Sequence, residues 1–122
     1  MSVYDDNNVF AKILRREIPC QPVYEDEHVL AFPDIAPKAP VHILVIPKGR
    51  YVSVVDFGAR ASTEEITAFW RAVAKLAAER GLPDSGFRTI ANTGLNGGQE
   101  VPHFHVHILG GRALGPMLAH TA

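Results

Sequence analysis

Apolar side chains recur at the three- and four-residue spacing of a helix in two stretches of this chain. Over residues 9–14 they follow Asn8, which can cap the first turn, and Ile18 followed by Pro19 ends the pattern. The second stretch spans about residues 62–80 and opens with a Ser-Thr-Glu-Glu capping box. It places Trp70 in the core or, if the protein self-associates, at an interface. We therefore predict two amphipathic helices.

Five shorter apolar runs have the length and the branched side chains that are typical of strands. A polar turn joins the first two, which predicts a hairpin, and the third is almost continuously apolar, which predicts a central strand buried on both faces. The short connections favour an antiparallel sheet with helices to one side, the α+β class. The predicted strands are residues 23–25, 29–32, 41–47, 87–92 and 103–109.

Composition adds limits on compartment and partners. The 122 residues suit a single domain, 1–122, with 47% hydrophobic and 20% charged residues. A net charge of −1 creates no general field that attracts a polyanion, so we expect no nucleic-acid partner. Neither a long apolar run nor a signal-peptide pattern is present, so we expect no membrane partner and a cytoplasmic location. A single cysteine, Cys20, agrees with a reducing compartment.

The last predicted strand alternates three histidines with apolar residues. Successive side chains of a strand point to opposite faces, so His103, His105 and His107 share one face at steps of roughly 6.6 Å, while Phe104 and Val106 enter the core. Two chemistries fit three aligned imidazoles. They can share a zinc ion with a ligand from elsewhere, or one can attack phosphorus while its neighbours hold phosphate oxygens.

Three further features lie where they can meet these histidines. His42 begins the central strand and supplies a fourth imidazole. Asp34 follows the second strand, where an acid either caps a turn or accepts hydrogen bonds from ribose hydroxyls. The loop 93–100 is rich in glycine and lacks the Gly-Lys-Ser/Thr ending of a Walker loop, but its backbone N–H groups can approach an anion closely. Each feature alone also has an ordinary structural explanation.

Together these residues resemble the histidine-triad (HIT) superfamily of nucleotide hydrolases and transferases, and within it the Hint branch. Its signature alternates three histidines with apolar residues before a short apolar end, as this chain does. The ending 114–120, which includes His120, is especially similar to bacterial Hint proteins. The likeness runs in the same order through residues 10–13, 17–19, 34–37, 40–48, Asn92 and 97–111, which is nearly the whole chain.

The resemblance implies an HIT fold, with a five-stranded antiparallel sheet, two helices and a homodimer whose sheet is continuous across the subunits. It implies hydrolysis of purine nucleoside phosphoramidates and related adenylates, including aminoacyl-adenylates. His105 would carry the nucleotidyl group, and His103 and His107 would orient it and bind phosphate oxygens. The other implied site residues are His42 beside the triad, Asp34 at the ribose, Asn92, Gly98, Gln99 and Glu100 at the phosphate and leaving group, and Phe10, Ile13 and Ile35 at the purine.

Three positions depart from the pattern of relatives. Some bacterial members carry Cys-x-x-Cys where this chain has Asn8 and Ala11, and a loop of backbone donors suits an anion better than a cation, so we expect no metal and no cofactor. Some Hint proteins have a serine where this chain has Glu100. The alternatives are a dinucleoside polyphosphate hydrolase of the same superfamily, which uses a glutamine such as Gln99, and a non-catalytic nucleotide-binding or interaction module.

Overall fold

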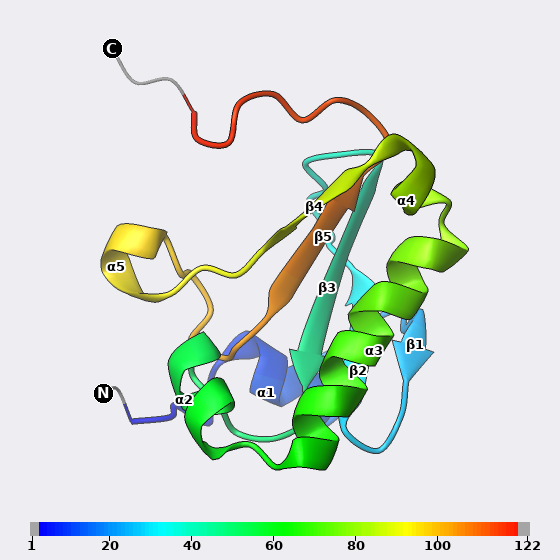
Figure 1. Ribbon diagram of the computed structural model, residues 1–122. Coiled ribbons are helices and arrows are strands. Elements are labelled where there is room, and N and C mark those ends of the chain that lie inside the picture. Colours follow the sequence, from blue (N-terminus) through cyan, green and yellow to red (C-terminus); the bar gives the residue numbers. More distant parts are fainter. Residues whose placement is uncertain (1–2, 120–122) are drawn as a thin grey trace.

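A five-stranded antiparallel sheet forms the centre of the molecule (Figure 1). The structure is a computed structural model that describes residues 3–119, so His120 lies outside the described part. Within these residues the strand order is β1-β2-β3-β5-β4, which confirms the predicted antiparallel sheet and the central position of the third strand. The strands are β1 Tyr24–Glu25, β2 Val29–Pro33, β3 Val41–Pro47, β4 Phe87–Ile90 and β5 Val106–Gly110.

The described residues contain five helices, so the prediction of two is wrong in number. The amphipathic pattern correctly located α1 and α3, and both have the predicted caps, Asn8 and the Ser62–Glu65 capping box. The three other helices have only four to seven residues, too few for a helical period to stand out in the sequence. The helices are α1 Val9–Leu14, α2 Val54–Arg60, α3 Thr63–Glu79, α4 Leu82–Ser85 and α5 Gly94–Gly97. Between residues 3 and 119, none is long and apolar enough to cross a membrane.

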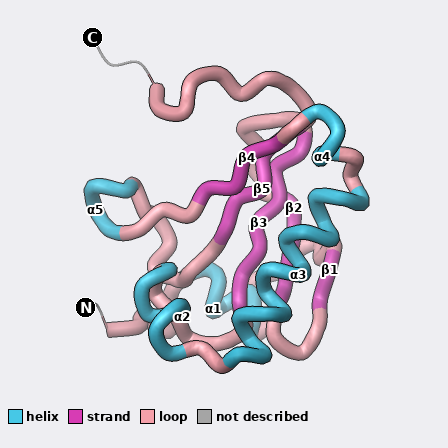
Figure 2. Tube along the Cα trace, viewed as in Figure 1, coloured by secondary structure: helices cyan, strands magenta, loops and turns pink. Residues whose placement is uncertain are grey.

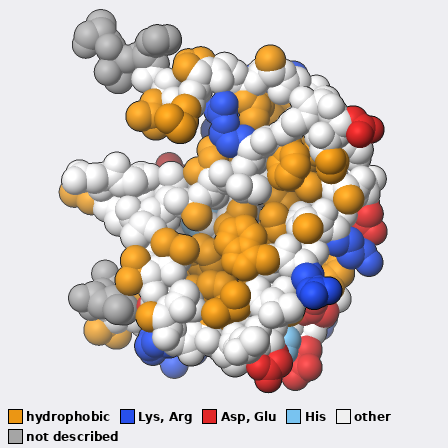
Figure 3. Space-filling view, viewed as in Figure 1, with side chains coloured by type: hydrophobic (Ala, Val, Ile, Leu, Met, Phe, Trp, Pro, Cys, Tyr) orange, Lys and Arg blue, Asp and Glu red, His pale blue; other side chains and the backbone are white. Residues whose placement is uncertain are grey.

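One face of the sheet packs against α3, which lies along β2 and β3 (Figure 2). Val45, Val106 and Phe69 are buried between them, and for Val106 this is the side that the alternation of the histidine stretch predicts. Trp70 is 45% exposed, because the neighbouring Phe69 takes the inward position, so of its two predicted places the core is wrong and the interface stays a prediction. Hydrophobic side chains gather in the middle of the view in Figure 3.

The homodimer with a continuous sheet stays a prediction.

The opposite face of the sheet carries α1 and a smaller apolar cluster, in which Phe10 packs with Phe32 and Leu44. His42 of β3 and His107 of β5 point to this same face, since Leu44 is the direct partner of His107 and His42 lies two residues before it. The sheet therefore separates an apolar side from a side that holds imidazoles.

Candidate active site

The first half of the histidine stretch is not a strand. β5 begins at Val106, and residues 103–105 lead into it without pairing to a neighbouring strand, so the prediction of one strand over 103–109 is wrong for these three residues. The backbone N–H of Phe104 donates instead to the carbonyl of Tyr51, at 2.7 Å. Side chains of this stretch nevertheless point alternately to the two faces of the sheet, because Phe104 and Val106 both enter the core against α3.

His105 presents one free ring nitrogen to a cavity. Its Nδ1 lies 2.7 Å from the carbonyl oxygen of His103, and a carbonyl oxygen can only accept, so Nδ1 carries the ring proton and Nε2 has a lone pair. Burial lowers the pKa of His105, which keeps the ring neutral near pH 7. The Phe10 ring contacts it edge to face, with centroids 5.0 Å apart. Nε2 of His105 is thus oriented and unprotonated, as a nucleophile must be.

His103 lies behind the cavity and supports it. Its Nε2–H donates to the carbonyl of Pro47 at 2.8 Å, and its Nδ1 lies 2.6 Å from the hydroxyl of Tyr4. The side chain is completely buried, and burial lowers the pKa of His103 to about 4. With both ring nitrogens engaged, His103 has no atom left for a phosphate oxygen. Of its two predicted roles, this arrangement fits the orienting one.

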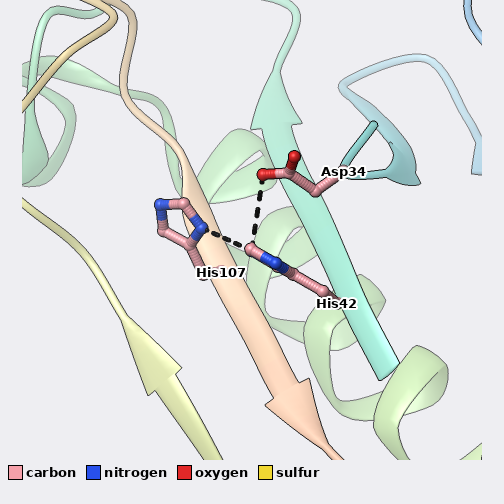
Figure 4. Close-up of side chains that lie close together, drawn as sticks. All are labelled: Asp34, His42 and His107. Carbon is pink, nitrogen blue, oxygen red and sulfur yellow. Dashed lines mark hydrogen bonds and ion pairs between the residues drawn. The ribbon is translucent and has the colours of Figure 1, made fainter. Parts of the chain in front are cut away.

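His42 and His107 form a relay of hydrogen bonds that ends at the cavity (Figure 4). The backbone N–H of Lys38 donates to Nδ1 of His42 at 3.0 Å, so the proton of His42 is on Nε2. That Nε2–H donates to Nδ1 of His107 at 2.9 Å and lies 3.5 Å from a carboxylate oxygen of Asp34. The proton of His107 is consequently on its Nε2. Burial lowers the pKa of both rings, that of His107 to about 4.

These groups border a cavity of about 410 Å³, within the range of small-ligand pockets. It brings together eight of the twelve predicted site residues from α1, β3, β5 and three connecting segments. The predicted residues at the cavity are Phe10, Asp34, His42, Asn92, Gly98, Glu100, His105 and His107. Leu44, Ile90, Val101 and Leu109 add apolar surface.

Besides His103, three residues that were predicted to touch substrate do not border this cavity. Ile13 borders a second cavity of about 520 Å³, and the side chain of Ile35 is fully exposed. Their contact with a purine stays a prediction. The amide of Gln99 accepts from the N–H of Gly94 at 3.1 Å and donates to two backbone carbonyls, at 2.6 and 3.1 Å. Its side chain braces the loop.

Two backbone N–H groups of the glycine-rich loop are used within the loop itself. Residues 94–97 form the helical turn α5, and the N–H groups of Gly98 and Gln99 donate to carbonyls within that turn, at 3.1 and 3.0 Å. The side chain of Asn92 also donates into the turn, to the carbonyl of Gly97 at 2.6 Å. The N–H groups of Gly98 and Gln99 are therefore engaged within the loop, and their contact with a phosphate stays a prediction.

The sequence interpretation missed two residues at the site. Lys38 borders the cavity, and its backbone fixes the proton of His42. Its place four residues before His42, among prolines, is the only signal in the sequence. Tyr4 reaches His103 across a separation of 99 residues, which no local pattern indicates.

A metal ion is also compatible with part of the site. Asp34, His42 and His107 each offer one ligand atom, and these atoms lie within 4.8 Å of one another. Imidazole and carboxylate are common zinc ligands. However, the Nδ1 of His107 and the Nε2 of His42 are already paired with each other, so a metal ion would have to replace that hydrogen bond.

Known proteins of one family resemble this chain over most of its length. A family model described as HIT domain matches residues 15–114. A 13.2 kDa HIT-like protein of Azospirillum brasilense is 56% identical over 115 residues, which cover 94% of each chain. A purine nucleoside phosphoramidase of Escherichia coli K12 is 49% identical, covering 94% of this chain and 96% of its own. The structure of a HIT family hydrolase from Clostridium thermocellum superimposes with a TM-score of 0.84 at 40% identity, covering 94% of this chain and 99% of its own.

Proposed function

Because this chain belongs to the HIT domain family, we propose that it hydrolyses purine nucleoside phosphoramidates and related adenylates, including aminoacyl-adenylates. The reaction releases a nucleoside 5′-monophosphate through a covalent nucleotidyl intermediate on His105. The observation that carries the proposal is the lone pair on Nε2 of His105, held at the cavity by the Nδ1–H bond to the carbonyl of His103. The name of the E. coli relative supports the choice of substrate.

In the first step the lone pair of His105 Nε2 forms a bond to the α-phosphorus, and the bond from phosphorus to the leaving nitrogen breaks. The imidazole gains positive charge, which the His103 carbonyl at 2.7 Å and the nearby carboxylates of Asp34 and Glu100 stabilise. The leaving amine takes up a proton. In the second step water attacks phosphorus, the bond to Nε2 breaks, and the water gives up a proton. One difficult displacement is thereby divided into two.

His107 stabilises the negative charge on the phosphoryl oxygens. The relay from Lys38 through His42 leaves its Nε2–H as a donor beside the cavity, and a phosphoryl oxygen is the matching acceptor. A fixed donor of this kind needs no reorganisation as charge develops, so it favours the transition state over the bound substrate.

The remaining cavity residues bind the nucleoside and assist departure of the amine. Asp34 accepts hydrogen bonds from the ribose hydroxyls, and Phe10 packs against the purine. Glu100 lies at the cavity and holds or passes the proton that the leaving amine needs. The purine nucleotide is the proposed partner, the protein acts as a cytoplasmic homodimer, and neither metal nor cofactor is needed.

The test compares kcat/KM for adenosine and guanosine phosphoramidates, an aminoacyl-adenylate and a diadenosine polyphosphate. We expect the phosphoramidates to be cleaved much faster than the polyphosphate. The same panel with a His105→Asn variant controls for contaminating phosphatases. Preference for the polyphosphate would favour the alternative hydrolase, and tight AMP binding without turnover of any substrate would favour a binding module.

A further inference from the structure

The segment before α1 is attached to the site by its aromatic residue. The hydroxyl of Tyr4 lies 2.6 Å from Nδ1 of His103, and the two rings meet edge to face with centroids 5.6 Å apart. The guanidinium of Arg50 lies over the Tyr4 ring, 5.1 Å from its centroid. Arg50 also makes two hydrogen bonds to the carboxylate of Asp6, at 3.0 and 2.8 Å. Tyr4 is therefore held from two sides.

The rest of this segment is tied down as well. Arg15 of the turn after α1 donates to the carbonyl of Asp6 at 2.8 Å. Asn8 donates to the carbonyl of Asp5 at 2.7 Å and accepts the N–H of Ala11 at 2.9 Å, which caps α1. The position of Tyr4 is thus coupled to α1, the same helix that supplies Phe10 to the cavity.

The hydroxyl of Tyr4 completes the hydrogen bonding of His103. The carbonyl of Pro47 can only accept, so the proton of His103 is on Nε2 and its Nδ1 needs a donor. Tyr4 is that donor. Without it, a completely buried acceptor would lose its partner, and only the bond from Nε2 to the carbonyl of Pro47 would hold the orientation of the ring.

His103 in turn holds His105, because its carbonyl accepts the Nδ1–H of that ring at 2.7 Å. A continuous path of contacts therefore leads from the N-terminal segment to the ring whose Nε2 faces the cavity. We propose that Tyr4 is a positioning residue, which fixes the ring of His103 and through it the orientation of His105. The effect on turnover rests on the proposed function, whereas the effect on the two rings does not.

The test is a Tyr4→Phe variant, which removes one oxygen and keeps the ring under Arg50. Tyr24→Phe is the matched control, because its hydroxyl also bonds a side chain, Asp26, at 2.7 Å but lies away from the site. Nitrogen-15 NMR of the free proteins reports the protonation of each ring nitrogen. In Tyr4→Phe we expect the Nδ1 signal of His103 to move to that of an unbonded nitrogen. We expect the Nδ1 signal of His105 to move toward that of a weaker hydrogen bond, because the carbonyl of His103 is held less firmly.

Turnover provides the second measurement. We expect kcat for adenosine phosphoramidate to fall about tenfold in Tyr4→Phe, the effect typical of losing a group that orients a ligand or nucleophile, with KM little changed because Tyr4 does not border the cavity. Tyr24→Phe should match the wild type in both measurements. Unchanged signals of His103 and His105, or changed signals with kcat within twofold of wild type, would overturn the proposal. If the wild type cleaves no phosphoramidate, the proposed function fails, and the histidine signals alone decide the role of Tyr4.

Discussion

The two faces of the sheet differ in what their side chains contribute, although the same strands carry both. On the α3 face, residues such as Val106 and Ile108 are buried among other apolar side chains, and their contribution is to stability. On the other face, His42 is buried and His107 is half-buried, and each has a polar partner at hydrogen-bond distance. Strand alternation places the two environments one residue apart. Mutations of adjacent residues should therefore separate stability from chemistry.

The histidine face also divides within itself. His103 has both ring nitrogens bound by protein groups, whereas His105 and His107 each have one nitrogen bound and the other left for substrate. The same side-chain type thus acts as a support at one place and as a reagent at the next. The number of protein partners on each ring makes the difference.

The largest effect is expected from His105→Asn. The asparagine amide can still donate to the His103 carbonyl, so the fold and nucleotide binding should remain while the nucleophile is lost. We expect kcat to fall by several orders of magnitude. His28→Asn, at the β1–β2 turn, is the control. Rapid quenching of the wild type and intact-mass measurement should show a nucleotidyl adduct on His105. Turnover by His105→Asn within tenfold of wild type would falsify the covalent mechanism.

A smaller loss is expected from His107→Asn. Asparagine can still accept the hydrogen bond from Nε2 of His42, but it lacks a donor at the place of the histidine Nε2. We expect kcat to fall about 10²–10³-fold, as when one preorganised donor is removed. His107→Gln, whose amide reaches further, should recover part of the loss. Equal losses in both variants would mean that the Nε2 donor is not what matters.

Acid should destabilise the histidine face. Burial lowers the pKa of His103 to about 4, whereas the same side chain in the unfolded chain has a pKa near 6.5. As the pH falls from 6.5 toward 4, the unfolded chain therefore binds a proton at this position and the native protein does not. Stability is full above that window and decreases through it, by about 2 kcal/mol for His103 between pH 7 and pH 5. The lowered pKa values of His42, His105 and His107 add in the same direction. Urea unfolding at both pH values measures the change, and a constant midpoint would contradict it.

Ile108→Val tests the apolar face next to the site. Ile108 is completely buried beside His107 in the sequence but points toward α3. Removing one methylene should lower the free energy of unfolding by about 1 kcal/mol, equally at pH 7 and pH 5, with kcat unchanged. Chemical denaturation and steady-state kinetics on the same preparation provide the measurement. A large loss of kcat would show that the two faces are not independent.

The smallest effect is expected from removing metal. Because Nε2 of His42 and Nδ1 of His107 are paired with each other, a metal ion at these two atoms would have to replace their hydrogen bond, and we expect turnover to be the same before and after dialysis against a chelator. Elemental analysis of the purified protein should find no stoichiometric zinc. Activity that is lost in chelator and restored by zinc would contradict this prediction.

Local patterns in the sequence determined most of the architecture. Helical spacing located α1 and α3, apolar runs located all five strands, and period-two alternation correctly assigned Phe104 and Val106 to the core. These features depend on contacts between neighbours in the chain or on which face of an element is apolar, and both are written in consecutive residues. The short helices α2, α4 and α5 were missed because four to seven residues carry little periodicity.

The protonation pattern of the site was decided only by the tertiary structure. The sequence predicts that four histidines meet at one site, but it does not determine which nitrogen of each ring is free. That depends on Tyr4 and Pro47 around His103, 99 and 56 residues away, and on His42 beside His107, 65 residues away. An imidazole is a donor at one nitrogen and an acceptor at the other, and its partners select the tautomer. Those partners are set by how distant segments pack, and no pattern of consecutive residues contains them.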